Sequence, residues 1–501
     1  MTRAVRRVPL LLIIAAAPLA SCGSDDGDGS GGGGIASLRI SVQAADPVPD
    51  DDPIKAALDE EVGVDLDMIT TAAAEYYTQL SADSAAGNLS DLFQVDRPRL
   101  EQLAEQGLLL DISDYLDDEL AAYTDAVEPD LRALGNIDGT DYGVVTPSGY
   151  NYSSYWIRKD WLDNLGLEVP ETTDDFFDVA VAFAQDDPDG NGHDDTYGLT
   201  GGNSGGLWNP LWAAFGSGGI GPAYGERGGA FYLDGSELVN GFYDPDTVDA
   251  LEYFRSLVES GAVDPDFMTQ DDAQAQERAM QGMAGIMNTT WPNMTKPEFV
   301  DQYKTVQPDA EWIQINPPSG PGGEGAYPWD NTATRMYGIP RTLENEPEKL
   351  EKLFELIAYS TTEEGRRLTS FGIEGEHYNL DGDTVVPTDL LDSDGGYFWI
   401  YQFTGRDEAE YMRVKFADDI DVIEFAENQP KLQTYNSLVL APEGYNPADA
   451  GRFAQEGIIA FVTGQRPLDE YDAFLETLSS QFGLQQFVDS GIDQLTELGI
   501  S

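Results

Sequence analysis

Two periods of apolar residues alternate along the first part of the chain after residue 35. A period of two is typical of a strand, and a period of about 3.6 is typical of a helix. The strand pattern covers 38–42 and 64–69, and 89–95 is a short apolar run between Asp and Pro that predicts a buried strand. The helix pattern covers 52–62, 75–86 and 99–106. Strands that alternate with helices at this spacing predict an α/β fold with a partly parallel sheet.

The same two patterns continue to the end of the chain. Further strands are predicted at 141–147 and 155–158, and further helices at 159–165, 176–183, 245–260, 270–282, 346–359 and 363–371. The tail from Pro447 is predicted to be mostly helical, with breaks at Gly464, Gly483 and Gly491. The Gly-rich stretch 200–235 predicts structured loops. Roughly 465 residues follow residue 35, a length that suggests two or three domains.

The N-terminus has the pattern of a secretory signal. Three arginines precede an apolar run, Leu10 to Leu19, which is too short to span a bilayer. Cys22, the only cysteine, follows Leu-Ala-Ser in a segment that resembles the bacterial lipobox, where the thiol is lipidated. We therefore expect a signal peptide over 1–22, a flexible Gly/Ser/Asp tether over 23–35 and a protein anchored by lipid to the outer face of the cell membrane. The alternative is a plain signal peptide with an incidental cysteine.

Charge excludes two classes of partner. The chain has 27 Lys+Arg and 91 Asp+Glu, which gives a formal net charge of −64. Nucleic acid and anionic membrane surfaces would be repelled, so we expect no nucleic-acid partner. Either an acidic pocket binds a cationic ligand, or the acids form a solvated surface suited to high ionic strength. Because the acids are spread along the chain, we favour the second interpretation.

One local motif has the spacing of a cation-binding loop. In 187–198, oxygen-bearing side chains stand at positions 1, 3, 5 and 9, and Gly192 stands at position 6. The expected calcium ligands are Asp187, Asp189, Asn191, the backbone carbonyl of His193, and Asp195, and the ion's role would be structural. Position 12 is Gly198, not the bidentate Glu of a full EF-hand loop. An Asp/Gly-rich turn without metal is the alternative.

Several segments, in order, resemble the extracellular solute-binding proteins of carbohydrate ABC importers, in the large lipoprotein branch related to alginate- and oligosaccharide-binding proteins. The segments are Trp156-Ile-Arg-Lys-Asp-Trp-Leu-Asp-Asn-Leu-Gly-Leu-Glu-Val-Pro170, the loop from Asp187 to Leu199, 260–267, 281–285, 372–378 and 461–468. The resemblance implies a two-lobed α/β fold of the periplasmic-binding-protein type (type II), in which each lobe is a sheet flanked by helices. It implies that the chain crosses between lobes near 146–150, 335–337 and 371–376. Lobe 1 would comprise 36–146 plus 337–372, and lobe 2 would comprise 147–336 plus 373–501.

The chemistry of sugars suggests which residues would contact a ligand between the lobes. Aromatic rings cover the C–H faces of pyranoses, and polar side chains bond their hydroxyl groups. The aromatic residues near the crossings and the Gly-rich loops are Tyr150, Tyr152, Trp208, Trp212, Trp291, Trp329 and Trp399, and the candidate hydroxyl acceptors are Asp96 and Asp330. For Trp291 the resemblance adds that the family places an aromatic residue in the cleft. Core packing is the alternative for each ring, and we assign Trp156 and Trp161 to the core.

The expected function is that of a binding protein and not of an enzyme. Only His193 and His377 exist, the single thiol is used by the anchor, and no phosphate-binding Gly-x-x-x-x-Gly-Lys loop occurs. We expect a monomer that captures a carbohydrate, closes around it and delivers it to the transmembrane permease subunits of an ABC transporter. A surface glycan-binding protein without a transport role and a surface glycosidase are the alternatives, and a ligand other than a sugar stays open.

Overall fold

The computed structural model describes residues 36–45, 47–49, 51–147, 149–220, 228–330, 335–442 and 444–500. The chain divides into the units Met1–Ile35 and Ala36–Ser501, and only the second lies in the described part. The predicted signal peptide, Cys22 and the tether fall outside the described residues.

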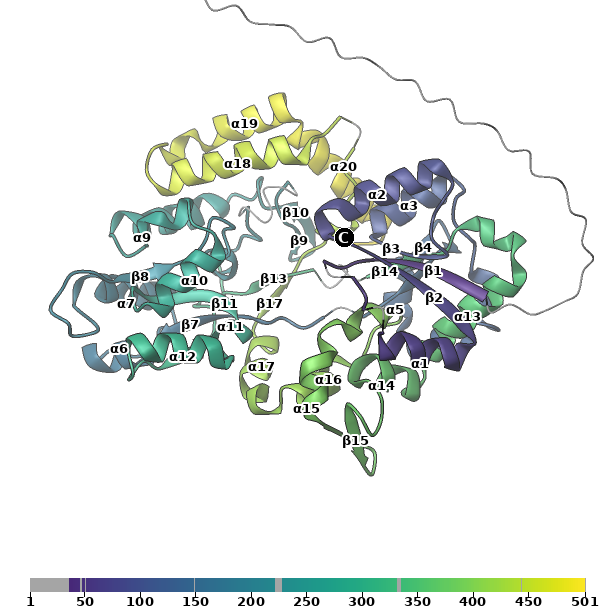
Figure 1. Ribbon diagram of the computed structural model, residues 1–501. Coiled ribbons are helices and arrows are strands. Elements are labelled where there is room, and N and C mark those ends of the chain that lie inside the picture. Colours follow the sequence, from purple (N-terminus) through teal and green to yellow (C-terminus); the bar gives the residue numbers. More distant parts are fainter. Residues whose placement is uncertain are drawn as a thin grey trace, which may run out of the picture. The chain divides into compact units, whose positions relative to one another are not determined.

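Five strands form the first sheet (Figure 1). They stand in the order β2-β1-β3-β14-β6; β1, β2, β3 and β14 are labelled in Figure 1. β1 is parallel to β2 and β3, whereas β14 runs antiparallel to both β3 and β6. The strands are β1 (Ala36–Gln43), β2 (Val64–Thr71), β3 (Leu92–Val95), β6 (Gly143–Val145) and β14 (Met336–Gly338). This sheet joins the beginning of the chain to a strand almost two hundred residues after β6.

Four strands form the second sheet, in the order β12-β7-β11-β8. β7 lies antiparallel to β12 and β11, and β8 lies parallel to β11. The strands are β7 (Ser153–Arg158), β8 (Tyr197–Thr200), β11 (Ala284–Thr290) and β12 (Trp312–Ile315). The remaining strands make two-stranded ladders: β4 (Asn136–Ile137) with β5 (Thr140–Asp141), β9 (Phe231–Asp234) with β10 (Glu237–Asn240), β13 (Tyr327–Trp329) with β17 (Lys431–Gln433), and β15 (Tyr378–Asp381) with β16 (Thr384–Pro387).

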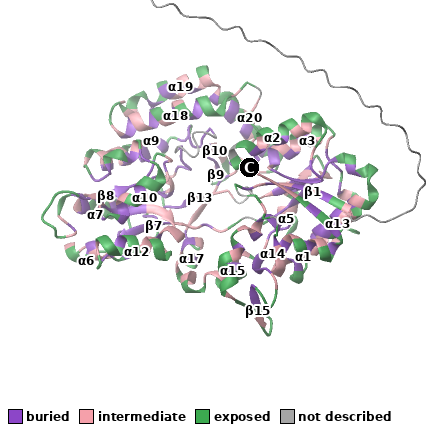
Figure 2. Cartoon of the chain, viewed as in Figure 1, coloured by how far each residue is buried: buried purple, intermediate pink, exposed green. Residues whose placement is uncertain are grey.

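Helices flank both sheets, and the strands are more deeply buried than the helices around them (Figure 2). The α-helices before β14 are α1 (Pro53–Val62), α2 (Ala73–Ala86), α3 (Arg97–Glu105), α4 (Ala121–Ala126), α5 (Pro129–Arg132), α6 (Lys159–Leu165), α7 (Thr173–Gln185), α9 (Thr247–Glu259), α10 (Asp272–Met280), α11 (Pro292–Thr295) and α12 (Pro297–Val306). Those after β14 are α13 (Pro347–Thr361), α14 (Glu363–Phe371), α15 (Asp389–Asp394), α16 (Glu408–Lys415), α17 (Ile420–Glu427), α18 (Pro447–Val462), α19 (Tyr471–Phe482) and α20 (Leu484–Glu497).

Local sequence explains where many of these helices begin and end. Asp52 accepts a hydrogen bond from the backbone N–H of Ile54 at 2.9 Å, Pro53 occupies the first turn of α1, and Gly63 ends the helix in the left-handed conformation. Thr172 and Asp175 form a reciprocal capping box at the start of α7. These capping residues place the helix ends within a few residues of the predicted ones.

Buried apolar side chains pack against both sheets, and one cluster of them includes residues of the two sheets. The core of the first sheet includes Leu38, Ile40 and Val42, and it extends to Trp156 and Trp291 of the second. The core of the second sheet includes Trp161, Phe254 and Phe461. Trp156 and Trp161 are buried, as predicted. Within the described residues, no helix has both the length and the apolar composition needed to cross a bilayer.

The fold-class prediction is confirmed, and one predicted helix break is wrong. Gly491 lies inside α20 and does not end it. A Cβ atom at this position would come within 2.5 Å of the Phe231 ring, so the glycine lets the helix approach β9 closely. The lobe boundaries at 146/147, 336/337 and 372/373 stay a prediction.

Candidate functional site

The two sheets are connected where β6 ends. Thr146 donates two hydrogen bonds to the carbonyl oxygen of Arg335, from its backbone N–H at 2.9 Å and from its hydroxyl at 3.0 Å. These bonds continue the β6–β14 ladder by one residue. Beyond them the chain runs from Pro147 to β7 of the second sheet, so segment 146–152 links one sheet to the other.

Tyr152, on this linking segment, contacts a partly buried ion pair. Its hydroxyl donates to Oε1 of Glu408 at 2.5 Å, and Arg406 bonds both oxygens of that carboxylate, at 2.7 and 2.9 Å. The guanidinium of Arg406 in turn lies over the Tyr411 ring, 3.3 Å from its centroid. Burial and the charge of Glu408 hold the pKa of Tyr152 well above its usual value, so the hydroxyl stays a donor.

Asn151, the neighbour of Tyr150, contacts a second ion pair. The backbone N–H of Asn151 donates to Oε2 of Glu427 at 2.7 Å, and Lys431 donates to Oε1 of the same carboxylate at 2.5 Å. The ammonium of Lys431 lies 4.8 Å from the centroid of the Trp329 ring. Burial raises the pKa of Tyr150, and the negative charge of Glu427 adds to the effect.

The other two candidates on these segments are also held by polar contacts. Asp330 follows β13 and accepts hydrogen bonds from the backbone N–H and the hydroxyl of Ser437, at 2.8 and 2.9 Å. Trp399 belongs to the 3-10 helix Gly395–Tyr401. The guanidinium of Arg335 lies 5.4 Å from its ring centroid and donates to its carbonyl oxygen at 3.4 Å.

These contacts define one candidate site, which we call the aromatic cluster. It comprises four partly exposed rings and the charged side chains near them: Tyr150, Tyr152, Trp329, Trp399, Arg335, Arg406, Glu408, Glu427 and Lys431. The residues come from four separate stretches of sequence. Apolar ring surface beside both donors and acceptors suits the binding of an amphipathic polar solute.

Three predicted ligand-facing tryptophans lie in the core instead. Trp208 stacks on Phe254 with ring centroids 4.7 Å apart, and Trp212 meets the same ring edge to face at 4.7 Å. Trp291 packs between Tyr152 and Phe416, at 6.4 and 5.0 Å. All three side chains are at most 3% exposed. In this structure they offer no free ring face, so the expectation that they present one to a ligand is not met.

Asp96 has a structural role. Its carboxylate accepts a hydrogen bond from the backbone N–H of Arg99 at 3.0 Å, as the N-cap of α3, and it pairs with the guanidinium of the same arginine. The short strand β3 ends directly before it, which explains why its sequence context resembles that of a ligand-binding acid.

The predicted calcium loop folds as a tight turn in which side chains bond to backbone. The backbone N–H of Gly192 donates to Asp187 at 3.0 Å, and the side-chain amide of Asn191 donates to Asp189 at 2.9 Å and to Asp195 at 3.2 Å. One carboxylate oxygen of Asp187 is buried and has no hydrogen-bond partner among the residues that the structure describes. No cluster of three or more His, Cys, Asp or Glu side chains stands ready for a metal ion among the described residues.

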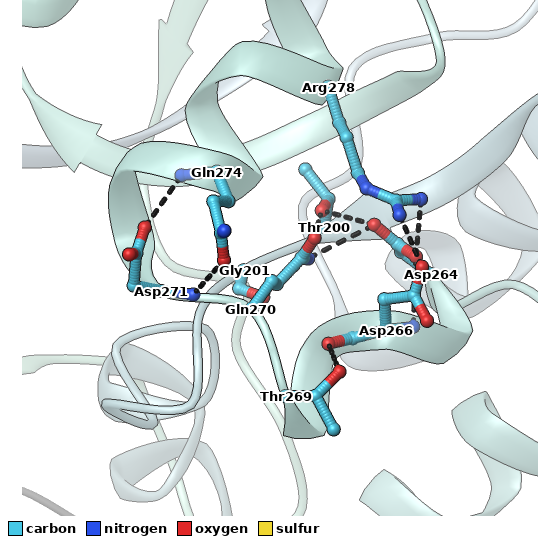
Figure 3. A network of polar contacts seen from close by, with 9 residues as sticks. All are labelled: Thr200, Gly201, Asp264, Asp266, Thr269, Gln270, Asp271, Gln274 and Arg278. Carbon is cyan, nitrogen blue, oxygen red and sulfur yellow. Dashed lines mark hydrogen bonds and ion pairs between the residues drawn. The ribbon is translucent and has the colours of Figure 1, made fainter.

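A second polar network, which the sequence analysis missed, lies around the fully buried carboxylate of Asp264 (Figure 3). Thr200 and Gln270 donate to one of its oxygens at 2.9 and 3.0 Å, and Arg278 donates to the other at 3.3 Å. Arg278 also pairs with Asp266. A solvent-open depression of about 540 Å³ lies beside Gln270 and Arg278. The network fixes the start of α10 next to the end of β8, which is a structural role.

The charged members of the aromatic cluster were also missed. Arg406, Glu408, Glu427 and Lys431 lie in a part of the chain for which the sequence analysis predicted no site. A usable signal was present, because Arg406 and Glu408 closely follow the aromatic run Tyr397–Tyr401.

Comparison with known families places this geometry in context. The profile described as bacterial extracellular solute-binding protein matches residues 44–367, which is more than half of the chain. The chain belongs to this family of solute-binding proteins. The match runs from the end of β1 into α14, so it includes the linking segment and Arg335.

Curated relatives and solved structures agree with this membership. Lipoprotein LipO of Bacillus subtilis is 26% identical over 388 residues, which covers 75% of this chain and 74% of the relative. The polygalacturonan/rhamnogalacturonan-binding protein YtcQ of the same organism is 28% identical over 395 residues, with 75% of each protein covered.

Two solved structures share the fold over 92% of this chain. They are an HMO-binding, ABC-transporter-associated solute-binding protein of Bifidobacterium longum infantis (TM-score 0.70, 18% identity, 98% of that chain covered) and the Streptococcus pneumoniae substrate-binding protein FusA in complex with kestose (TM-score 0.68, 19% identity, 99% covered). A FusA structure described as an EF-hand mutant also matches, with a TM-score of 0.65. At these identities the structures show the fold alone.

Proposed function

We propose that this family member binds an oligosaccharide at the aromatic cluster and delivers it to the permease of an ABC importer. The single observation that supports the ligand class is the cluster itself, in which partly exposed tyrosine and tryptophan rings stand beside carboxylates and cations. Ring faces suit the C–H surface of sugars, and the charged groups suit their hydroxyls. The saccharide ligands of YtcQ and FusA support the same class.

Delivery to a permease and anchoring by lipid complete the proposal. FusA is described as an ABC-transporter substrate-binding protein and LipO as a lipoprotein. A lipid on Cys22 would hold the binding unit at the outer face of the membrane, where a permease could receive the solute. No step of this cycle makes or breaks a bond in the ligand. Closure around the solute would have to be favoured by contacts made only in the bound state.

A thermal-shift screen followed by titration calorimetry tests the ligand class. The full chain is screened against neutral and acidic oligosaccharides, and hits are titrated against wild type and the variants Tyr150→Ala and Trp329→Ala. We expect at least one saccharide to bind, and both variants to weaken it. An absence of binding across the panel, or affinity unchanged in both variants, would contradict the proposal.

We also propose that loop 187–195 binds calcium. The donor set of carboxylate, amide and carbonyl oxygens is the kind that Ca²⁺ prefers. The buried oxygen of Asp187 without a partner, and the two carboxylates that meet at one amide group of Asn191, fit a bound cation. Gly198 at position 12 supplies no side-chain ligand, so water or another residue would have to complete the shell. The role would be structural.

A further inference from the structure

Arg335 differs from the other cations of the aromatic cluster in its neighbours. Lys431 is paired with Glu427, and Arg406 is paired with Glu408 through two hydrogen bonds. Arg335 has no carboxylate within ion-pair distance in the part of the chain that the structure describes, and its side chain donates a hydrogen bond to the carbonyl oxygen of Trp399 at 3.4 Å. In a chain with 91 acidic and 27 basic residues, an arginine at a binding site without an acidic partner calls for an explanation.

The guanidinium of Arg335 is held in position before any ligand arrives. Its backbone oxygen accepts two hydrogen bonds from Thr146, at 2.9 and 3.0 Å, and its side chain lies over the ring of Trp399. Trp399 is fixed in turn, because the backbone N–H of Gln402 donates to its carbonyl oxygen at 3.2 Å. Both side chains are partly exposed, so their remaining surface is accessible to solvent.

The same contacts connect Arg335 to the rest of the cluster. The residue after Thr146 is Pro147, whose ring lies against Gly405; a Cβ atom on that glycine would come within 2.5 Å of Pro147. Arg406 follows directly, and through Glu408 it reaches Tyr152. Arg335 and Trp399 are therefore at one end of a continuous set of contacts and Tyr152 is at the other, as subsites of one extended ligand would be.

We propose that Arg335 and Trp399 form a subsite for the carboxylate of a uronic acid, so that the bound oligosaccharide is an acidic one. This inference rests on the proposed function. A guanidinium presents its donors in a planar fork that matches a carboxylate, and a neutral hydroxyl would leave its charge without a counterion. Surface acids more than about 8 Å away are largely screened at physiological salt. The attraction between Arg335 and the ligand's carboxylate therefore outweighs the repulsion from those acids.

The expected size of the effect follows from the type of hydrogen bond. A hydrogen bond to a charged group contributes enough to change affinity about 10- to 100-fold relative to an uncharged counterpart. Wild type should therefore prefer an acidic oligosaccharide over the neutral one of the same length by about this factor. The preference should depend on Arg335 and not on the many other arginines of the surface.

Titration calorimetry on the full chain tests the inference. The probes are trigalacturonate and trimannuronate, the matching neutral trimers, and kestose. The variants are Arg335→Gln, which removes the charge, and Arg335→Lys, which keeps the charge but not the fork. Arg452→Gln is the matched control, because that side chain is 70% exposed on α18 and pairs with Asp449. Melting temperatures establish that each variant is folded.

The outcomes separate this inference from the proposed function. We expect wild type and Arg452→Gln to prefer an acidic trimer, Arg335→Gln to lose the preference, and Arg335→Lys to keep part of it. Binding of a neutral trimer or kestose without such a preference would overturn the inference and leave the proposed function standing. A preference that survives in Arg335→Gln would do the same. If no saccharide binds, the proposed function fails, and the inference fails with it.

Discussion

The hydroxyl of Tyr152 donates a 2.5 Å hydrogen bond to Glu408, and this bond joins the segment that follows β6 to the start of α16. The two residues are separated by 256 positions in sequence. Arg406 holds the same carboxylate through both of its oxygens. A change in ligand contact at Tyr152 would therefore reach α16 directly.

Removing the Tyr152 hydroxyl and removing the Glu408 charge should lower the free energy of unfolding by different amounts. Tyr152→Phe loses one hydrogen bond while Arg406 still holds Glu408, and we expect a loss of about 1 kcal/mol in the free energy of unfolding. Glu408→Gln leaves the largely buried Arg406 without its counterion, and we expect a loss of about 2–3 kcal/mol. Urea denaturation measures both. The Tyr150 hydroxyl makes no hydrogen bond to the residues that the structure describes, so Tyr150→Phe should change stability by less than about 0.5 kcal/mol. Equal losses in Tyr152→Phe and Glu408→Gln would show that the ion pair contributes nothing.

Substitutions of Trp291 and Trp329 should have different effects, the first mainly on stability and the second mainly on ligand binding. Trp291 is 2% exposed and packs against Tyr152 and Phe416, so Trp291→Ala should cost about 3–5 kcal/mol of stability. Trp329 is partly exposed, so Trp329→Ala should cost about 1 kcal/mol but weaken oligosaccharide binding roughly ten-fold. Chemical denaturation and calorimetry provide the two readouts. The assignment is wrong if Trp291→Ala keeps full stability or if Trp329→Ala binds like wild type.

Sequence predicted the elements well where periodicity and caps act locally. The helices at 53–62 and 159–165 and the strand at 64–71 lie close to their predicted limits, because Pro53, Gly63 and Gly166 mark helix ends by their own backbone preferences. The order of the strands in each sheet depends on contacts between distant segments. No local pattern places β14 between β3 and β6, and the family resemblance implied two lobes and their crossings but no strand order.

Sequence could not rank the aromatic residues by depth. The Gly-rich stretch around Trp212 predicted structured loops that could present its tryptophans to a ligand, but its glycines allow dense packing. A Cβ atom at Gly218 would come within 2.3 Å of the Tyr232 ring, and one at Gly219 within 2.8 Å of the Trp212 ring. Glycine here permits rings to lie against the backbone. Whether a glycine opens a loop or brings two segments together depends on the packed structure and not on the composition of the loop.

The net charge should make stability depend on salt. A formal charge of −64 opposes the compact state through repulsion among the acids, and added salt shortens the screening length from about 10 Å at 0.1 M to about 3 Å at 1 M. We expect the melting temperature, measured by calorimetry, to rise as NaCl increases over this range. A melting temperature that is the same at both concentrations would contradict the interpretation of the acids as a surface suited to high ionic strength.

The effect of Asp189 on the melting temperature should depend on both pH and calcium. Burial raises the pKa of its carboxyl, and the neighbouring carboxylates of Asp187 and Asp195 raise it further. A folded-state pKa above the unfolded value stabilises the protein at acid pH, and this stabilisation is lost as pH rises through the raised pKa. At pH 7 without calcium, the ionised Asp189 therefore destabilises the loop, and Asp189→Asn should raise the melting temperature in EGTA.

Calcium should reverse the order of the two melting temperatures, so that wild type becomes more stable than Asp189→Asn. The reason is that the ion stabilises the ionised carboxylate, which is unfavourable without calcium. We expect Ca²⁺ to raise the melting temperature of the wild type at pH 7 and to have little effect on Asp189→Asn, and the wild-type response should fade as pH falls through the raised pKa of Asp189. Asp383→Asn, in the exposed turn between β15 and β16, is the matched control and should respond to calcium like wild type. Equal calcium responses in wild type and Asp189→Asn, or none in the wild type, would show that the loop is an Asp/Gly-rich turn and not a metal site.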